Sequence, residues 1–136
     1  MSTVRTGVGA GILLGLAMSV LLWAWAASPA HAQTVDECQA DIAALKVQTQ
    51  NATFTGQNAA KDRAGLIGKL DSASAKLNQG KFQDALANLQ SFRAKVVALD
   101  QQGKIVHQDA ENLVAGADDA IACVQDLTDA QSAAAA

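Results

Sequence analysis

The stretch "KLNQGKFQDALANLQSFRAKVVAL", from Lys76 to Leu99, contains the end of one helical pattern and the start of another. Asn78-Gln79-Gly80 ends the first pattern, because a glycine just past a helix can take the left-handed conformation that closes the last turn. The second pattern has apolar residues at alternating spacings of three and four: Phe82, Ala85, Leu89, Phe92, Val96 and Leu99. This spacing places them on one face of an amphipathic helix. The stretch therefore predicts two core-facing helices joined by a tight corner.

Three segments around this helix show a similar spacing. They cover about residues 35–49, 59–79 and 108–129, with a Thr-, Asn- and Gly-rich loop after the first and Gly103 before the last. Ile105 is expected to fill the corner after Gly103. The expected core positions of the three segments are Val35, Cys38, Ile42, Leu45, Thr49, Ile67, Leu70, Ala73 or Ser74, Leu77, Ala110, Leu113, Ala117, Ala120, Val124 and Leu127. No segment alternates as a strand does, so the sequence predicts an all-α fold, a compact up-and-down bundle of four helices.

The N-terminal segment has the features of a secretory signal. Arg5 precedes an uncharged apolar run over residues 7–27, and Ala30-His31-Ala32 fits the small-x-small pattern of a cleavage site. We predict a signal peptide helix over residues 1–32 and cleavage between Ala32 and Gln33. The alternative is an uncleaved membrane anchor, because the run is about as long as the 20 residues that span a bilayer. The expected location is secreted, periplasmic or in the cell envelope.

Cleavage would leave the bundle domain at residues 33–129 and a tail at 130–136. The tail, rich in alanine and of low complexity, is predicted to be disordered. Removal of residues 1–32 takes away one of the ten Lys and Arg residues and none of the thirteen acids. The remaining domain is mildly acidic and has no basic patch, so binding to nucleic acid is not expected.

Two cysteines, Cys38 and Cys123, lie near opposite ends of the domain. In an up-and-down bundle the first and fourth helices are antiparallel neighbours, so the start of one and the end of the other lie at the same level. An exported protein meets an oxidising environment. We therefore predict a disulfide between Cys38 and Cys123. The alternative is two separate buried thiols that pack as small apolar side chains.

Residues 66–127 resemble the small helical domain named FIMAH, which occurs in secreted bacterial hydrolases, adhesins and other surface proteins. The resemblance rests on Leu70, Leu77, Gly80, Ala85, Leu89, Phe92, Val96, Leu99, Gly103, Lys104, Ile105, Ala110, Leu113, Ala117 and Ile121. It implies a three-helix FIMAH-like core, to which this chain adds an N-terminal helix and the cysteine pair. It also implies a non-catalytic accessory module for attachment or protein contact.

The residue types that support chemistry are few outside the signal segment. After residue 32, His107 is the only histidine of the chain. No second histidine or cysteine cluster accompanies it to complete a metal site. Asp118 and Asp119 are adjacent, and adjacent helical residues do not face each other. With Glu111, Asp126 and Asp129 they predict an acidic, solvent-exposed face. We therefore expect no catalytic, metal-binding or cofactor-binding residues and no cofactor.

The sequence favours a secreted, non-catalytic helical interaction or attachment module. Its expected partner is a protein or a cell-surface component, and contact with a membrane is expected only through the signal segment if that segment is retained. A different class of function, a carrier of a small apolar ligand in the bundle core, stays open. An enzyme is not expected, because nucleophiles, bases and metal ligands are scarce.

Overall fold

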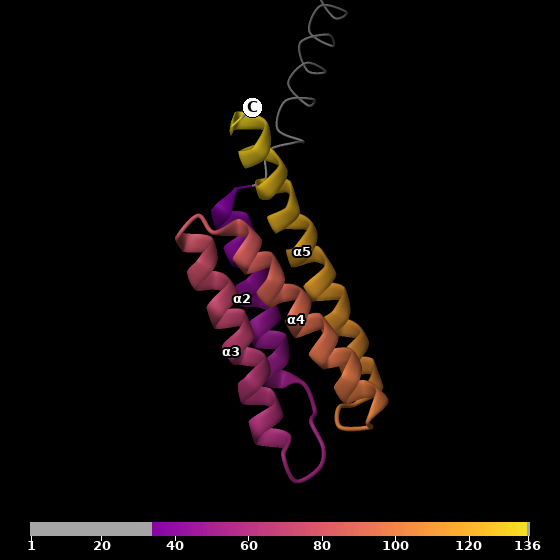
Figure 1. Ribbon diagram of the computed structural model, residues 1–136. Coiled ribbons are helices and arrows are strands. Elements are labelled where there is room, and N and C mark those ends of the chain that lie inside the picture. The colour runs from indigo at the N-terminus through magenta and orange to yellow at the C-terminus, as the bar shows by residue number, and fades with distance from the viewer. Residues whose placement is uncertain (1–33, 136) are drawn as a thin grey trace, which may run out of the picture. The chain divides into compact units, whose positions relative to one another are not determined.

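A computed structural model describes residues 34–135, which form four helices in an up-and-down bundle (Figure 1). Helix α2 spans Val35–Asn51, α3 spans Ala59–Asn78, α4 spans Phe82–Gln101 and α5 spans His107–Ala135. Each helix packs against two others, in the ring order α2, α3, α4, α5 and back to α2. The predicted four-helix fold is confirmed. The predicted signal peptide helix and its cleavage site at Ala32 and Gln33 lie outside the described residues.

The interior is filled by side chains from all four helices. Phe92 and Leu89 of α4 are completely buried, as predicted from the spacing, whereas Phe82 at the start of that helix is only partly buried. In α3 the buried stripe passes through Leu66, whereas Ile67, an expected core position, is only partly buried. Each fully buried leucine or phenylalanine contributes about 1.5–3 kcal/mol through the removal of apolar surface from water. The common core therefore holds the ring of helices together.

Two glycine corners reverse the chain after α3 and after α4. Gly80 and Gly103 have φ angles of 74° and 67°, in the left-handed region that glycine adopts at little cost. At the first corner the Lys81 N–H donates to the Lys76 carbonyl, and at the second the Lys104 N–H donates to the Leu99 carbonyl. Both corners have the hydrogen bonding of a Schellman motif, which satisfies carbonyls that the helix end leaves free. The corner predicted from the sequence around Gly80 is thus confirmed.

The loop between α2 and α3 docks on the corner between α4 and α5, at the same end of the bundle. The Thr55 N–H donates to the Lys104 carbonyl at 2.9 Å, and the Val106 N–H donates to the Thr53 carbonyl at 3.0 Å. These bonds flank an isolated antiparallel bridge between Phe54 and Ile105, and both of these side chains are buried. Ile105 fills the corner as expected. The matching role of Phe54 was not predicted.

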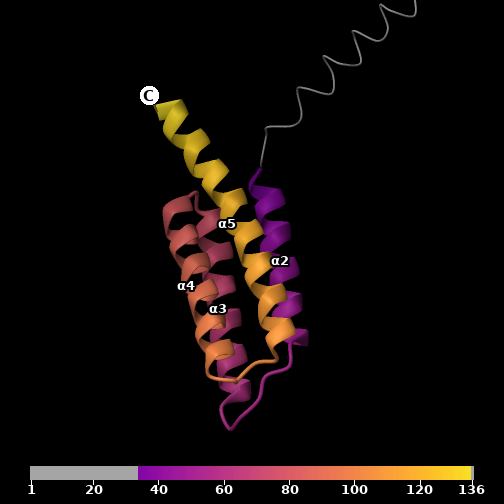
Figure 2. The same cartoon turned by 90° about the vertical axis from the view of Figure 1, so that its right-hand side faces the viewer.

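Helix α2 is joined to α5 at the other end of the bundle. Cys38 and Cys123 form the predicted disulfide, with their Cα atoms 5.6 Å apart. Both residues are buried. Figure 2 shows α2 and α5 side by side, running in opposite directions. The bond closes the ring between its first and last helices.

The C-terminal tail differs from its prediction. Residues 130–136 were expected to be disordered, but α5 continues to Ala135, and residues 130–134 are exposed helix beyond the end of the bundle (Figure 1). The physical reason is that alanine has the highest helix propensity. Adding residues to a helix that has already formed avoids the cost of nucleation. The tail needs no packing to be helical.

Candidate functional site

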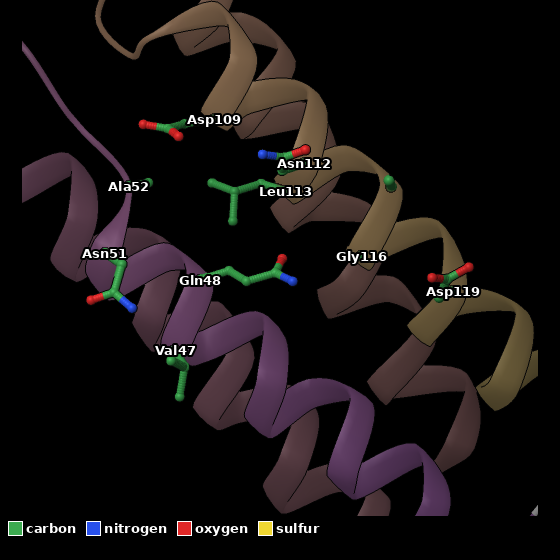
Figure 3. A pocket seen from close by; sticks show the side chains of 10 residues that line it. Val47, Gln48, Asn51, Ala52, Asp109, Asn112, Leu113, Gly116 and Asp119 are labelled. Atoms are coloured by element: carbon green, nitrogen blue, oxygen red, sulfur yellow. The ribbon is translucent and has the colours of Figure 1, made fainter.

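A groove of about 470 Å³ lies between α2 and α5 (Figure 3). Its walls combine amide, carboxylate and small apolar side chains. The lining residues are Val47, Gln48, Asn51, Ala52, Asp109, Asn112, Leu113, Ala115, Gly116 and Asp119. A smaller hollow of about 100 Å³ adjoins it and adds Asp41, Ala44 and Leu45 of α2, while it shares Gln48, Gly116 and Asp119 with the groove. Together the two hollows, which we call the α2–α5 groove, extend along most of α2.

Close approach of the two helices forms the floor of the groove. A Cβ atom added to Gly116 would lie 2.9 Å from Cδ1 of Leu45 and 3.1 Å from Oε1 of Gln48. Any larger residue at position 116 would therefore push against α2. Figure 3 shows the Gln48 side chain reaching from α2 across toward α5. Gly116 thus lets the Gln48 amide lie in the groove between the helices.

The two adjacent acids of α5 serve different flanks of the helix. The Asp118 carboxylate accepts a hydrogen bond from Arg93 Nε of α4 at 2.7 Å, whereas Asp119 lines the groove beside α2. The sequence predicted one solvated acidic face for this part of α5. Both carboxylates are exposed, as predicted, but they have different neighbours, because adjacent helical residues point about 100° apart and meet different helices of the ring.

A third carboxylate, Asp109, closes the far end of the groove. Its Oδ2 accepts a hydrogen bond from the Thr53 N–H at 2.8 Å, so it also anchors the loop between α2 and α3. Figure 3 shows Asp109 and Asn112 on the same flank of α5, facing α2. The groove therefore has a carboxylate at each end and amides between them.

The pKa of the Asp41 carboxyl is raised above its ordinary value. Partial burial is the main cause, and the negative charges of Asp119 and Glu37 raise this pKa further. The folded protein therefore binds this proton at higher pH than the unfolded chain does. As the pH rises through that range, ionisation of Asp41 lowers the stability of the fold. The acids at this end of the groove thus repel one another.

The other three seams of the ring are bridged by cations. Lys46 of α2 pairs with Asp71 of α3 at 2.8 Å, Arg93 of α4 pairs with Asp118 of α5, and Lys95 of α4 lies 3.8 Å from a carboxylate oxygen of α3. Among residues 34–135, no ion pair links α2 to α5. The covalent bond between Cys38 and Cys123 crosses this seam instead. The groove therefore lies along the one seam that has carboxylates on both helices and no bridging cation.

His107 lies away from the groove, at the exposed start of α5. Its Nδ1 lies 3.0 Å from Asp100, and its Nε2 lies 3.4 Å from Glu111. The hydrogen bond to Asp100 raises the pKa of His107 above its ordinary value, and the charges of Asp100 and Glu111 raise it further. Across residues 34–135 no group of three or more His, Cys, Asp or Glu side chains is arranged to hold a metal ion.

The groove residues were not identified from the sequence, although a signal for them exists. Positions 41, 44, 48 and 51 of α2 and positions 109, 112, 116 and 119 of α5 repeat with spacings of three, four and three. These are second stripes, of polar and small residues, beside the apolar core stripes. Such a stripe is ordinarily a solvated flank. Only the pairing of α2 with α5 makes the two stripes face one groove.

Comparisons of the chain with models of protein families, with curated proteins and with solved structures found no match. The resemblance to FIMAH therefore stays a prediction from the sequence. Within the described part of the chain, no helix is both long enough and apolar enough to cross a bilayer.

Proposed function

We propose that this protein is exported and acts outside the cytoplasm as a non-catalytic interaction module that contacts a partner protein through the α2–α5 groove. The groove itself carries the proposal. Val47, at its edge, is 54% exposed and is one of the two large exposed apolar side chains of residues 34–135. Exposed apolar groups with adaptable amides beside them, here Gln48 and Asn51, are suited to contact with another protein.

Export is supported by two independent features. Residues 1–32 have the charge and hydropathy pattern of a signal peptide. The Cys38–Cys123 disulfide belongs to an oxidising compartment, because cytosolic thiols are kept reduced. The resemblance of residues 66–127 to FIMAH supports the same class of function.

The chemistry of the groove supports a binding role. None of its lining residues is a serine, threonine, cysteine, lysine or histidine, so the groove offers no hydroxyl, thiol, amine or imidazole nucleophile. The alternative of an apolar ligand carried in the core has less support, because Phe92, Leu89 and Leu66 are completely buried against the other core residues. The groove opens at the surface instead.

Photocrosslinking in the organism that makes the protein tests this function. A photoreactive amino acid replaces Val47, and in a matched protein it replaces Ala94, which is exposed on α4. We expect one defined adduct from position 47 that excess wild-type protein removes, and no such adduct from position 94. Equal adducts from both positions, or adducts that wild-type protein does not compete away, would contradict the proposed function.

A further inference from the structure

The charges along α5 differ between its two flanks. A hollow of about 260 Å³ between α4 and α5 is lined by three acids, Asp100, Glu111 and Asp118. Each of them has a cationic or protonatable partner within the fold: Arg93 lies beside Asp118, and His107 lies beside Asp100 and Glu111. Side chains of the same fold therefore offset the negative charges on this flank of α5.

The flank that faces α2 has no such compensation. Asp41, Asp109 and Asp119 line the α2–α5 groove, and no Lys, Arg or His is among its lining residues. Asp109 accepts a backbone N–H, which leaves its negative charge in place. Asp41 and Asp119 carry like charges across the groove, and after the effect of burial their repulsion further raises the pKa of Asp41. A positively charged group between them relieves this repulsion, so charge complementarity favours a cationic occupant.

The dimensions of the groove limit the shape of that occupant. Asp109 and Asp119 are ten residues apart on α5, which corresponds to about 15 Å at the helical rise of 1.5 Å per residue. An extended peptide advances about 3.3 Å per residue, so about five residues cover this distance. The amides of Gln48 and Asn112 lie between the acidic ends, where they can donate to and accept from a peptide backbone.

We propose that the α2–α5 groove binds a short extended segment of a partner protein that carries a lysine or arginine at each end. This inference rests on the proposed function and specifies the chemistry of the partner. The basic side chains pair with Asp109 at one end and with Asp41 and Asp119 at the other. The apolar middle of the segment lies near Val47 and the amides.

The test uses the exported protein as purified, with its disulfide intact, and two synthetic peptides. One is acetyl-Lys-Ala-Val-Ala-Lys-amide, and the other has glutamate in place of both lysines. Binding is followed by NMR titration at millimolar peptide. We expect the lysine peptide to shift the side-chain amide signals of Gln48 and Asn112, and added salt to weaken its binding.

Charge-neutralising variants locate the binding. Asp41→Asn combined with Asp119→Asn should weaken binding of the lysine peptide by about tenfold. The matched control is Asp126→Asn combined with Asp129→Asn, which removes the same charge from exposed positions of α5 outside the groove. It should change the affinity less than about twofold. Asp109 is left unchanged because it also holds the Thr53 N–H.

Several results would overturn the inference. They are binding of the glutamate peptide at the same amides with equal affinity, an equal effect of the two double variants, or no shift of Gln48 and Asn112 by the lysine peptide. The first of these leaves the groove as a contact site and refutes only the cationic occupant. Failure of the proposed function is recognised separately, in the photocrosslinking experiment, by the absence of a specific adduct at position 47. If a double variant fails to fold, the wild-type protein provides the test. Binding of the lysine peptide that added salt does not weaken would then overturn the inference.

Discussion

Removing the disulfide should lower the free energy of unfolding of this protein by a large fraction of the total that is typical of a small domain. Cys38 and Cys123 are 85 residues apart in sequence, and the bond keeps this long loop closed in the unfolded chain. In the chain-entropy model, a loop of this length corresponds to about 4.6 kcal/mol at 25 °C. A small domain has a total free energy of unfolding of about 5–15 kcal/mol. The variant Cys38→Ala with Cys123→Ala should therefore be folded but marginal.

Chemical denaturation of the exported protein measures this effect. The helical circular dichroism signal is followed against guanidinium concentration for the oxidised wild type and for the double variant. We expect a lower midpoint for the variant. We also expect a larger dependence of its free energy on denaturant, because its unfolded chain is less compact and exposes more surface.

The single variants provide the control. Cys38→Ala alone and Cys123→Ala alone should each lose about as much stability as the double variant, because either change breaks the bond, and the effects then do not add. A loss below about 1 kcal/mol in the double variant would refute the loop-closure reasoning. Additive losses from the single variants would mean that the two residues stabilise the fold only by packing.

Three other predictions concern the core, the exposed corner and processing. Phe92→Ala should lower the free energy of unfolding by about 3–5 kcal/mol in denaturant melts, because it leaves a cavity at a completely buried site; Phe82→Ala, at a partly buried site, should cost less, and equal losses would contradict the core assignment. NMR titration should find the pKa of His107 above its ordinary value of 6.5 and closer to 6.5 in Asp100→Asn. Because this pKa is raised in the fold, the His107–Asp100 pair stabilises fully below 6.5 and loses its contribution as the pH rises through the folded pKa, so a stability difference between wild type and Asp100→Asn that grows with pH would be inconsistent with it. N-terminal sequencing of the exported protein should begin at Gln33, and an N-terminus that retains the apolar segment would show that the anchor alternative is correct.

Several features of the fold follow from short-range sequence patterns. The spacing of apolar residues in α4 fixes which face of that helix is buried, because the helical period relates sequence position directly to direction around the axis. Gly80 and Gly103 mark the corners, since both require a left-handed backbone conformation. Predicting the disulfide between Cys38 and Cys123 required one further assumption, which is that the four helices run alternately up and down. Each of these inferences uses neighbours along the chain or a simple rule of topology.

The loop before α3 could not be read in this way. Phe54 is buried against Ile105, and the Arg63 guanidinium lies over its ring, with 5.1 Å between Cζ and the ring centroid. The Arg63 side chain also donates to the Ala52 carbonyl at 3.1 Å. A loop has no period from which burial can be read. Its packing depends on the corner between α4 and α5, which is about 50 residues away in sequence.

The sequence alone determined the four helices of the bundle and most of their core positions, and it predicted the pairing of Cys38 with Cys123. The tertiary structure decided which flanks of the helices meet. Asp118 and Asp119 are the same residue type and adjacent in sequence. Asp118 is paired with Arg93, whereas Asp119 lines the groove opposite α2. The physical reason is that a helical period gives directions around one axis only. Whether a side chain on a given flank meets an opposite charge depends on which helix packs against that flank in the closed ring.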